Sequence, residues 1–171
     1  RDPDATVTIQ YGPVGVVAAF SPWNYPVLQA SKKLAALLAS GCSCVLKPAE
    51  ETPSATIAFL QCLIDGGLPA HVINMVFGVP SEVSSFLIRD PRVAKITFTG
   101  SIPVGKLLAA QAGKYMKPVT MELGGHSPVL ICEDADLDSA VDILVTRKFA
   151  NSGQVCVSPN RFYVHESIIE D

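Results

Sequence analysis

A cysteine near the end of the sequence closes a short polar turn. Cys156 ends the stretch 151–156, which reads Asn-Ser-Gly-Gln-Val-Cys, and residues 161–164 after it form a strand-like run. A thiolate is a strong nucleophile, and small residues before it let a substrate approach the backbone closely. The same pattern also fits an inert cysteine that packs as a small apolar side chain. Residues elsewhere must decide between the two.

Two other polar side chains could serve a cysteine nucleophile. Glu122 interrupts an apolar strand end, so its carboxylate must pair with a cation, take up a proton or face a cavity. It is therefore a candidate general base or one half of a structural ion pair. Asn24 follows a buried strand-like run, where its amide could donate to an oxyanion or bond the local turn. A cysteine hydrolase would instead need a histidine, and His126 is the histidine to consider.

Phosphate-binding chemistry has two candidate sites. The segment from Gly100 to Gly105 follows a strand and opens a helix, where backbone N–H groups can bind a pyrophosphate. It lacks the middle glycine of the common dinucleotide fingerprint, so an ordinary strand-to-helix turn is the alternative. Lys47 and Glu50 follow another strand, and they could meet a phosphate or a ribose diol, or be two solvated loop charges.

These residues sit in a repeated strand–helix pattern. Strand-like runs are expected over residues 14–20, 44–47, 72–77 and 95–99, and helices over 27–40, 53–65 and 81–88. The turn at 100–105 is expected to lead into a fourth helix that ends near residue 113. In the first helix Lys32 and Lys33 lie opposite the apolar face. Repeated βα units with short loops predict a doubly wound α/β fold with a mostly parallel, Rossmann-like sheet. Ligands then bind beyond the carboxyl ends of the strands.

The regular alternation of strands and helices changes after residue 118. Strands are expected over 119–123 and 129–132 and a helix over 136–150, with Gly124-Gly125 as a break. We therefore expect a partial cofactor-binding domain over 14–123 and the beginning of a second α/β domain over 124–171. Residues 7–11 alternate apolar and polar types as a strand does. We assign residues 1–13 to a strand segment of an oligomerisation region.

Composition excludes several classes of function. The net charge is -3, and no basic patch of the kind that nucleic acid requires is present. No apolar run approaches the about 20 residues that a membrane span needs. The five cysteines are odd in number and scattered, which favours reduced thiols in the cytoplasm or an organelle matrix. The pair Cys42 and Cys44 has no second pair nearby, so no metal site is expected.

Taken together, these motifs resemble the aldehyde dehydrogenase superfamily. The resemblance covers nearly the whole chain, from about Gly12 to Glu166. Five segments carry it in family order: 22–26 (PWNYP), 47–50 (KPAE), 98–101 (FTGS), 122–125 (ELGG) and 153–156 (GQVC). The reaction that it implies is the oxidation of an aldehyde to a carboxylic acid with NAD, or with NADP, through a cysteine thiohemiacetal and a thioester.

The resemblance also implies a role for each matching residue. Cys156 would be the nucleophile, Asn24 and the Cys156 N–H would hold the oxyanion, and Glu122 would activate the hydrolytic water. The remaining matches fall on the cofactor side: Lys47 and Glu50 at the adenosine ribose, Trp23 and Ser101 at the pyrophosphate, Phe98 and Gly100 at the wall of the cofactor site, together with Gly105 of the glycine segment. Glu50 favours NAD over NADP, because a carboxylate repels a 2′-phosphate.

Two features of the sequence refine this expectation. His126-Ser127-Pro128 follows the paired glycines and is similar to the succinate-semialdehyde dehydrogenase branch, which indicates a semialdehyde substrate. The chain is also much shorter than members of the superfamily, so we expect an internal fragment that is inactive alone, from a homo-oligomer (dimer or tetramer). The alternatives are an acyl-transferring or esterase-type thiol enzyme on the same scaffold, or a binding module without turnover.

Overall fold

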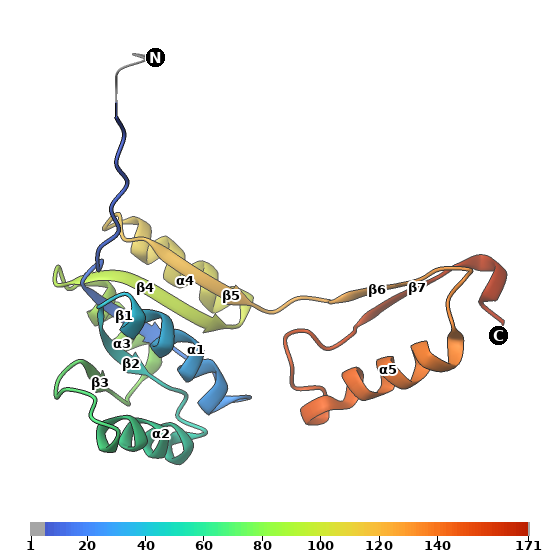
Figure 1. The fold of residues 1–171 in the computed structure, drawn as a ribbon, viewed down its shortest axis with the longest axis horizontal. Helices are drawn as coiled ribbons and strands as arrows, with labels where there is room; N and C mark the ends of the chain where they lie inside the picture. Colours follow the sequence, from blue (N-terminus) through green and yellow to red (C-terminus); the bar gives the residue numbers. More distant parts are fainter. Residues whose placement is uncertain (1–5, 171) are drawn as a thin grey trace.

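The computed structural model of this chain describes residues 6–170. Its larger part is a five-stranded parallel sheet with the strand order β3-β2-β1-β4-β5, and its smaller part is a two-stranded parallel sheet, β6-β7, with one long helix (Figure 1). This arrangement confirms the predicted α/β class and the mostly parallel sheet.

The larger sheet is built from four βα units and a final strand. Its strands are β1 (Val16–Phe20), β2 (Ser43–Lys47), β3 (Ile73–Met75), β4 (Val93–Gly100) and β5 (Val119–Leu123). Its helices are α1 (Pro26–Ala39), α2 (Pro53–Asp65), α3 (Pro80–Arg89) and α4 (Ile102–Gly113). Each of these helices has a proline in its first two positions, where the missing N–H costs no helical hydrogen bond.

Apolar side chains of β1 alternate between two cores, one on each face of the sheet. Val17 and Ala19 pack with α1, whose Leu34 is 1% exposed. Ala18 and Phe20 point to the other face and pack in a core that contains Ile88 of α3. Burial of one such aliphatic side chain contributes about 1.5 to 3 kcal/mol. The two cores fix β1 at the centre of the sheet.

The chain reverses direction across the sheet at β1. From β1 it runs outward through β2 and β3, and it then returns to the other side of β1 to form β4 and β5. Ligands bind at such a switch point, beyond the carboxyl ends of the two diverging strands. The loops at that position follow β1 and β4, and they contain residues 21–25 and 101.

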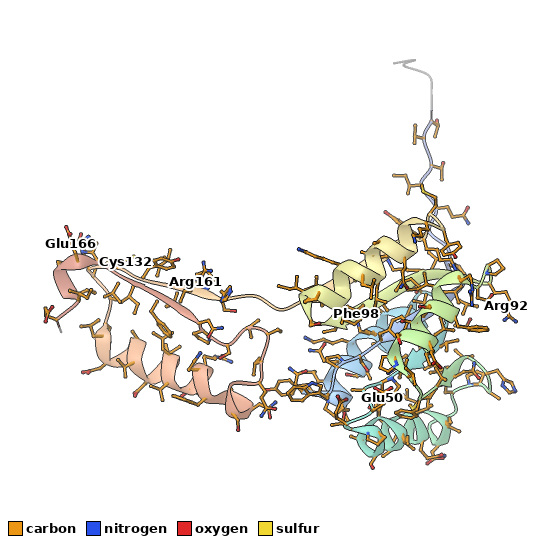
Figure 2. All side chains as sticks on the ribbon, turned by 180° about the vertical axis from the view of Figure 1, so that it is seen from behind. Glu50, Arg92, Phe98, Cys132, Arg161 and Glu166 are labelled. Carbon is orange, nitrogen blue, oxygen red and sulfur yellow. The ribbon has the colours of Figure 1, made fainter. Side chains whose placement is uncertain are left out.

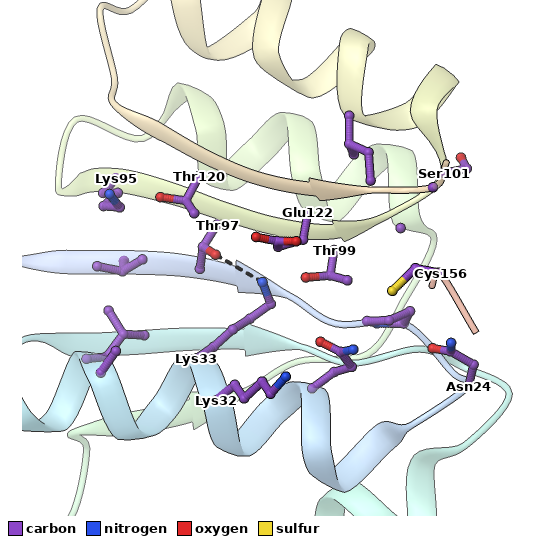
Figure 3. A pocket seen from close by; sticks show the side chains of 18 of the residues that line it. Asn24, Lys32, Lys33, Lys95, Thr97, Thr99, Ser101, Thr120, Glu122 and Cys156 are labelled. Atoms are coloured by element: carbon purple, nitrogen blue, oxygen red, sulfur yellow. Dashed lines mark hydrogen bonds between the residues drawn. The ribbon is translucent and has the colours of Figure 1, made fainter. Parts of the chain in front are cut away.

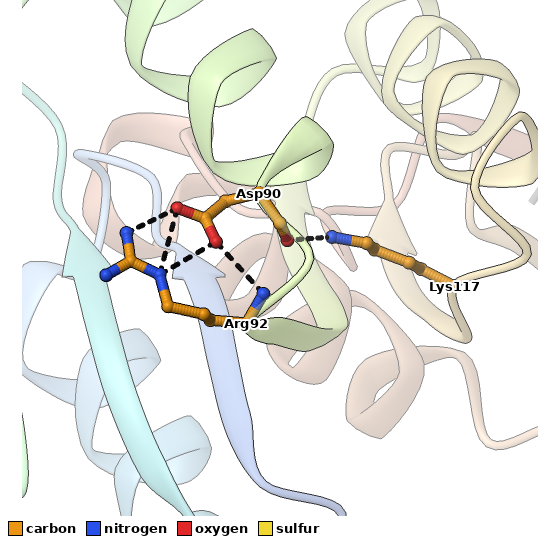
Figure 4. A network of polar contacts seen from close by, with 3 residues as sticks. All are labelled: Asp90, Arg92 and Lys117. Carbon is orange, nitrogen blue, oxygen red and sulfur yellow. Dashed lines mark hydrogen bonds and ion pairs between the residues drawn. The ribbon is translucent and has the colours of Figure 1, made fainter.

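Polar contacts join two loops at the amino ends of β4 and β5. The Arg92 guanidinium donates to the Asp90 carboxylate, with Nη2 2.6 Å from Oδ2, and Lys117 Nζ donates to the Asp90 carbonyl at 2.5 Å (Figure 4). The hydrogen bonds from Arg92 hold the pKa of Asp90 well below its usual range. These contacts join the loop between α3 and β4 to the loop before β5.

The smaller part exposes most of its apolar side chains. Its elements are β6 (Pro128–Ile131), α5 (Leu137–Phe149), the 3-10 turn η1 (Ala150–Gly153), β7 (Arg161–Val164) and the 3-10 turn η2 (Glu166–Ile168). Figure 2 shows Cys132, Arg161 and Glu166 in this part, away from Glu50 and Phe98 in the larger one. No described residue of α5 is buried, and Phe149 is 69% exposed. Asp136 caps the helix, because its side chain accepts from the Ser139 N–H.

Two predictions about the first residues were wrong. Residues 7–11 form no strand: Val7 and Tyr11 are 84% and 93% exposed, and no described strand lies beside them to share hydrogen bonds. The strand predicted from residue 14 begins at Val16, after Gly15 takes a φ of 112°, which is outside the strand region. The predicted segment 1–13 also includes residues 1–5, which lie outside the described residues.

The predicted boundary at residue 124 falls where the chain leaves the larger sheet. An extended segment crosses from β5 to β6 there (Figure 1). The division into domains stays a prediction. No helix in residues 6–170 combines the length and the apolarity that crossing a membrane requires.

Candidate functional site

A groove of about 890 Å³ runs between α1 and the face of β4 and β5 beside it (Figure 3). Alternate residues of a strand share one face, so Thr97 and Thr99 of β4 both line the groove. Thr120 and Glu122 of β5 lie beside them in register, with Thr99 paired to Glu122. A row of polar side chains therefore faces α1 across the groove.

Cys156 lines one end of this groove, after the turn that ends α5. The turn has unusual backbone geometry, because Asn151, Ser152 and Gly153 all have positive φ values of 49°, 58° and 76°. Cys156 is exposed. Its backbone carbonyl accepts a hydrogen bond from Ser127 Oγ at 3.3 Å. The turn directs the thiol to the carboxyl ends of the sheet strands, as Figure 3 shows.

Asn24 reaches the same end of the groove from the loop after β1 (Figure 3). Its Nδ2 donates to the Gln154 carbonyl at 2.8 Å. In return, Asn151 Nδ2 donates to the Asn24 carbonyl at 3.0 Å. The loop after β1 is thus bonded directly to the turn that precedes Cys156.

Glu122 faces the groove from β5, and its side chain is exposed. The position of Glu122 in the groove matches the cavity alternative, and Glu122 forms no ion pair with any of residues 6–170. Asn24, Glu122 and Cys156 therefore line one groove although they come from three separate segments.

A lysine of α1 adds a charge beside Glu122. Lys33 Nζ donates to Thr97 Oγ1 at 3.0 Å, across the groove from α1 to β4 (Figure 3). Burial lowers the pKa of Lys33 from 10.5 to about 8, although the nearby Glu122 carboxylate opposes this change. The expectation that Lys33 lies on the helix face opposite the core was therefore incomplete, because this face turns into the groove.

Lys47, the last residue of β2, forms an ion pair with Glu50 in the loop that follows. The Lys47 side chain is 6% exposed and also donates to the Pro48 carbonyl at 3.2 Å, so the reading of two solvated charges is wrong for Lys47. Burial acts to raise the pKa of Glu50, but the hydrogen bond and charge of Lys47 bring this pKa below its usual value. This pair does not line the groove with Cys156.

The loop after β4 places the remaining predicted residues. Gly100 and Ser101 line the groove, as does Trp23 of the loop after β1. Phe98 is buried in the core on the other face of the sheet, with its ring against Gly100. Gly105 is buried inside α4, where a Cβ atom would lie 2.4 Å from the Leu123 side chain. Gly105 therefore serves the packing of α4 on β5, and it lies outside the groove lining.

Comparison with known proteins identifies the family. Residues 1–171 match the aldehyde dehydrogenase family over the whole chain. The chain belongs to the aldehyde dehydrogenase family. This confirms the resemblance expected from the five sequence motifs.

Individual relatives are similar to this chain in sequence, and solved structures are similar to it in fold. The 4-(hydroxymethyl)benzenesulfonate dehydrogenase TsaD1 of Comamonas testosteroni is 48% identical over 100% of this chain and 36% of its own length. The succinate semialdehyde dehydrogenase of Acinetobacter baylyi is 42% identical over 98% of this chain and 35% of its own length. The crystal structure of an aldehyde dehydrogenase from Brucella melitensis superposes with a TM-score of 0.90 at 41% identity, over 93% of this chain and 33% of that one. The chain thus spans about a third of the length of these relatives.

The histidines of this aldehyde dehydrogenase chain do not support a cysteine hydrolase. His71, His126 and His165 are all described, and none lines the groove that contains Cys156. His165 instead bonds Ser167 at 2.9 Å near the end of the chain. Among residues 6–170, no group of three or more His, Cys, Asp or Glu side chains is arranged to hold a metal ion.

Several residues of the groove, and Asn151 in the turn beside it, were not predicted from the sequence. Lys95, Thr97 and Thr99 alternate with apolar residues along β4, and this period of two could have indicated a polar face. Asn151 and Gln154 contact Asn24 across 127 and 130 positions of sequence, and no local pattern predicts such contacts.

Proposed function

We propose that the protein containing this chain oxidises an aldehyde to a carboxylic acid with NAD or NADP as the hydride acceptor. The observation that carries the proposal is the meeting of three groups in one groove: the Cys156 thiol, the Asn24 amide and the Glu122 carboxylate. Membership of the aldehyde dehydrogenase family supports the same reaction.

The first step forms a bond to the substrate at Cys156. The thiolate attacks the aldehyde carbon, and the π electrons of the carbonyl move to its oxygen. One N–H of the Asn24 amide and the Cys156 backbone N–H donate to this oxyanion. Asn24 Nδ2 donates one of its two hydrogens to the Gln154 carbonyl, so the second hydrogen remains available to the substrate oxyanion.

The second half of the reaction releases the acid. NAD or NADP, when bound, would supply the hydride acceptor. Cys156 then keeps the oxidised substrate as a thioester. Glu122 takes a proton from water, whose oxygen attacks the thioester carbon. The carbon–sulfur bond breaks, the acid leaves, and Cys156 is again a thiolate. An enzyme that transferred the acyl group to a thiol would not need this base, so Glu122 disfavours the acyl-transfer alternative.

Residues after β2 and β4 fit a nicotinamide dinucleotide. The first turn of α4 has no side-chain cap, and Pro103 in it has no N–H, while the Gly105 N–H donates to the Ser101 carbonyl. The N–H groups of Ile102 and Val104 therefore remain for a phosphate beside Ser101. The Glu50 carboxylate can accept from both hydroxyls of a ribose, while Lys47 supplies a donor next to it. A carboxylate at this position favours NAD, although relatives named as NADP-dependent succinate-semialdehyde dehydrogenases also exist. Trp23 and Gly100 would complete the wall of this site.

Other parts of the proposal concern the substrate and the assembly. Succinate-semialdehyde dehydrogenases among the relatives and the His126-Ser127-Pro128 sequence together favour a semialdehyde substrate. The exposed apolar residues Val7, Ile9 and Tyr11 favour a homo-oligomer in which a partner covers them. Five free cysteines fit a reducing compartment such as the cytoplasm.

An activity panel on the full-length protein tests this function. Semialdehydes, aliphatic aldehydes and aromatic aldehydes are each supplied with NAD and with NADP, and the Cys156→Ala variant serves as the blank. We expect formation of reduced cofactor with the wild type, fastest with a semialdehyde and NAD, and none with the variant. Equal rates in the two proteins would refute a mechanism through Cys156.

A further inference from the structure

The two parts of the chain are hydrogen-bonded to each other through a single residue. Within residues 6–170, the hydrogen bonds that join the part before Gly124 to the part after it are the donation from Asn24 to Gln154 and the donation from Asn151 to Asn24. One uses the Asn24 side chain and the other its backbone carbonyl. Both bonds end in the turn before Cys156.

The backbone of this turn is shaped for these contacts. Asn151 has φ and ψ of 49° and 39°, and Ser152 has 58° and 30°, which is the left-handed region. Asparagine enters that region more readily than most residues. The Gln154 N–H donates to the Asn151 carbonyl at 3.1 Å, so Asn151 also closes the turn that presents the Gln154 carbonyl.

The orientation of the Asn24 amide depends on this turn. Its Oδ1 is buried and has no hydrogen-bond partner among the described residues. The 2.8 Å bond from Nδ2 to the Gln154 carbonyl is therefore the polar contact that sets how the amide is rotated. Rotation of the amide by half a turn would place two oxygens against each other.

We infer that Asn151 is a positioning residue for the proposed aldehyde oxidation. It holds the Asn24 backbone through its own amide and the Asn24 side chain through Gln154, and it thereby fixes the oxyanion donor relative to the Cys156 sulfur. This inference rests on the proposed function. Misplacement of a reacting group by about 1 Å can cost about 100-fold in rate, so a clamp of this kind has a measurable effect.

The test replaces Asn151 in the full-length enzyme in two ways. Asn151→Gly keeps the left-handed backbone and removes the amide, whereas Asn151→Asp keeps the size and replaces the donor by an acceptor. We expect kcat to fall at least about tenfold in both variants, with an unchanged KM for the cofactor. Ser152→Gly is the matched control, because it eases the same turn and leaves both hydrogen bonds in place. Its kcat should stay within about twofold of wild type.

A double-mutant cycle separates positioning from general support of the fold. If Asn151 acts through Asn24, the variant with both Asn24→Ala and Asn151→Gly should be no slower than Asn24→Ala alone. Rates are expressed per active cysteine, counted from the burst of reduced cofactor, so that a loss of folded enzyme does not count as a loss of kcat. The inference would be overturned if the kcat losses of the two single variants multiplied in the double variant. A wild-type kcat in Asn151→Gly would overturn it as well. A wild type without Cys156-dependent oxidation would refute the proposed function instead.

Discussion

At the scale of single residues, the groove brings together side chains with separable tasks. Cys156 comes from the smaller part of the chain, whereas Glu122 comes from β5 of the larger sheet. Neither of them is hydrogen-bonded through its side chain to another described residue. Both groups are therefore available to a substrate, and their contributions can be tested one at a time.

The role of Glu122 predicts a specific kinetic defect. Glu122→Gln removes the base and keeps the shape, so the thioester should form but hydrolyse slowly. We expect a retained burst of reduced cofactor and a steady-state kcat lower by about 10² to 10⁴-fold, measured by rapid mixing. Glu82→Gln, which changes an exposed carboxylate of α3, is the control and should leave both phases intact. Loss of the burst together with the steady state would contradict a role confined to hydrolysis.

At the scale of elements, helix α1 carries a buried charge into the groove. The pKa of Lys33 is about 8 in the folded chain and 10.5 when it is unfolded. The unfolded chain therefore binds more protons between these two values, and the free energy of unfolding should rise as pH rises from about 8 to 10.5. Below about pH 8 Lys33 is charged in both the folded and the unfolded chain, so burial of this charge lowers the free energy of unfolding by its full amount.

This pH dependence can be measured by urea unfolding of the chain. Lys33→Met should flatten the rise between pH 8 and 10.5, because the titrating group is gone. Lys32→Met changes the exposed neighbour on the same helix and should preserve the rise. An identical pH profile for Lys33→Met and wild type would show that the slope has another origin.

The contact of α4 with β5 gives a second prediction about an element. A Cβ atom at Gly105 would lie 2.4 Å from Leu123, so Gly105→Ala must push that side chain aside. We expect a loss of about 1 kcal/mol in the free energy of unfolding, because Leu123 can turn partly away. Gly113→Ala in the same helix meets nothing within 4 Å and should gain up to about 1 kcal/mol. A stabilised Gly105→Ala variant would contradict this packing.

Elements were predictable where local pattern and tertiary structure agree. The buried run of β1 and the prolines at the first positions of α1, α2 and α3 signal the boundaries of these elements to within a few residues. The alternation at residues 7–11 misled because a strand also needs a partner, which a pattern cannot reveal. Lys33 looked like an ordinary solvent-facing lysine because the sequence does not show which strands lie beside α1. Motifs identified Asn24, Glu122 and Cys156, but only the fold shows that they share a groove.

At the scale of the whole molecule, the groove is open on a chain that spans about a third of its relatives' length. The side chains of Glu122 and Cys156 are both exposed. Hydrogen bonds to a developing oxyanion stabilise it far more when water is excluded. The arrangement of the reactive groups is therefore present in this chain, whereas their shielding from water is incomplete.

The isolated chain of 171 residues should consequently fail to oxidise aldehydes. We expect no formation of NADH above that of the Cys156→Ala chain with any aldehyde of the panel. Circular dichroism should show that both chains are folded, and alkylation of Cys156 by iodoacetamide, followed by peptide mass spectrometry, should show that the thiol is accessible. Reactive thiol without turnover would indicate that shielding by further protein, rather than formation of the nucleophile, is what the chain lacks. NADH production by the wild-type chain alone would contradict this, and it would mean that the groove is sufficient for the reaction.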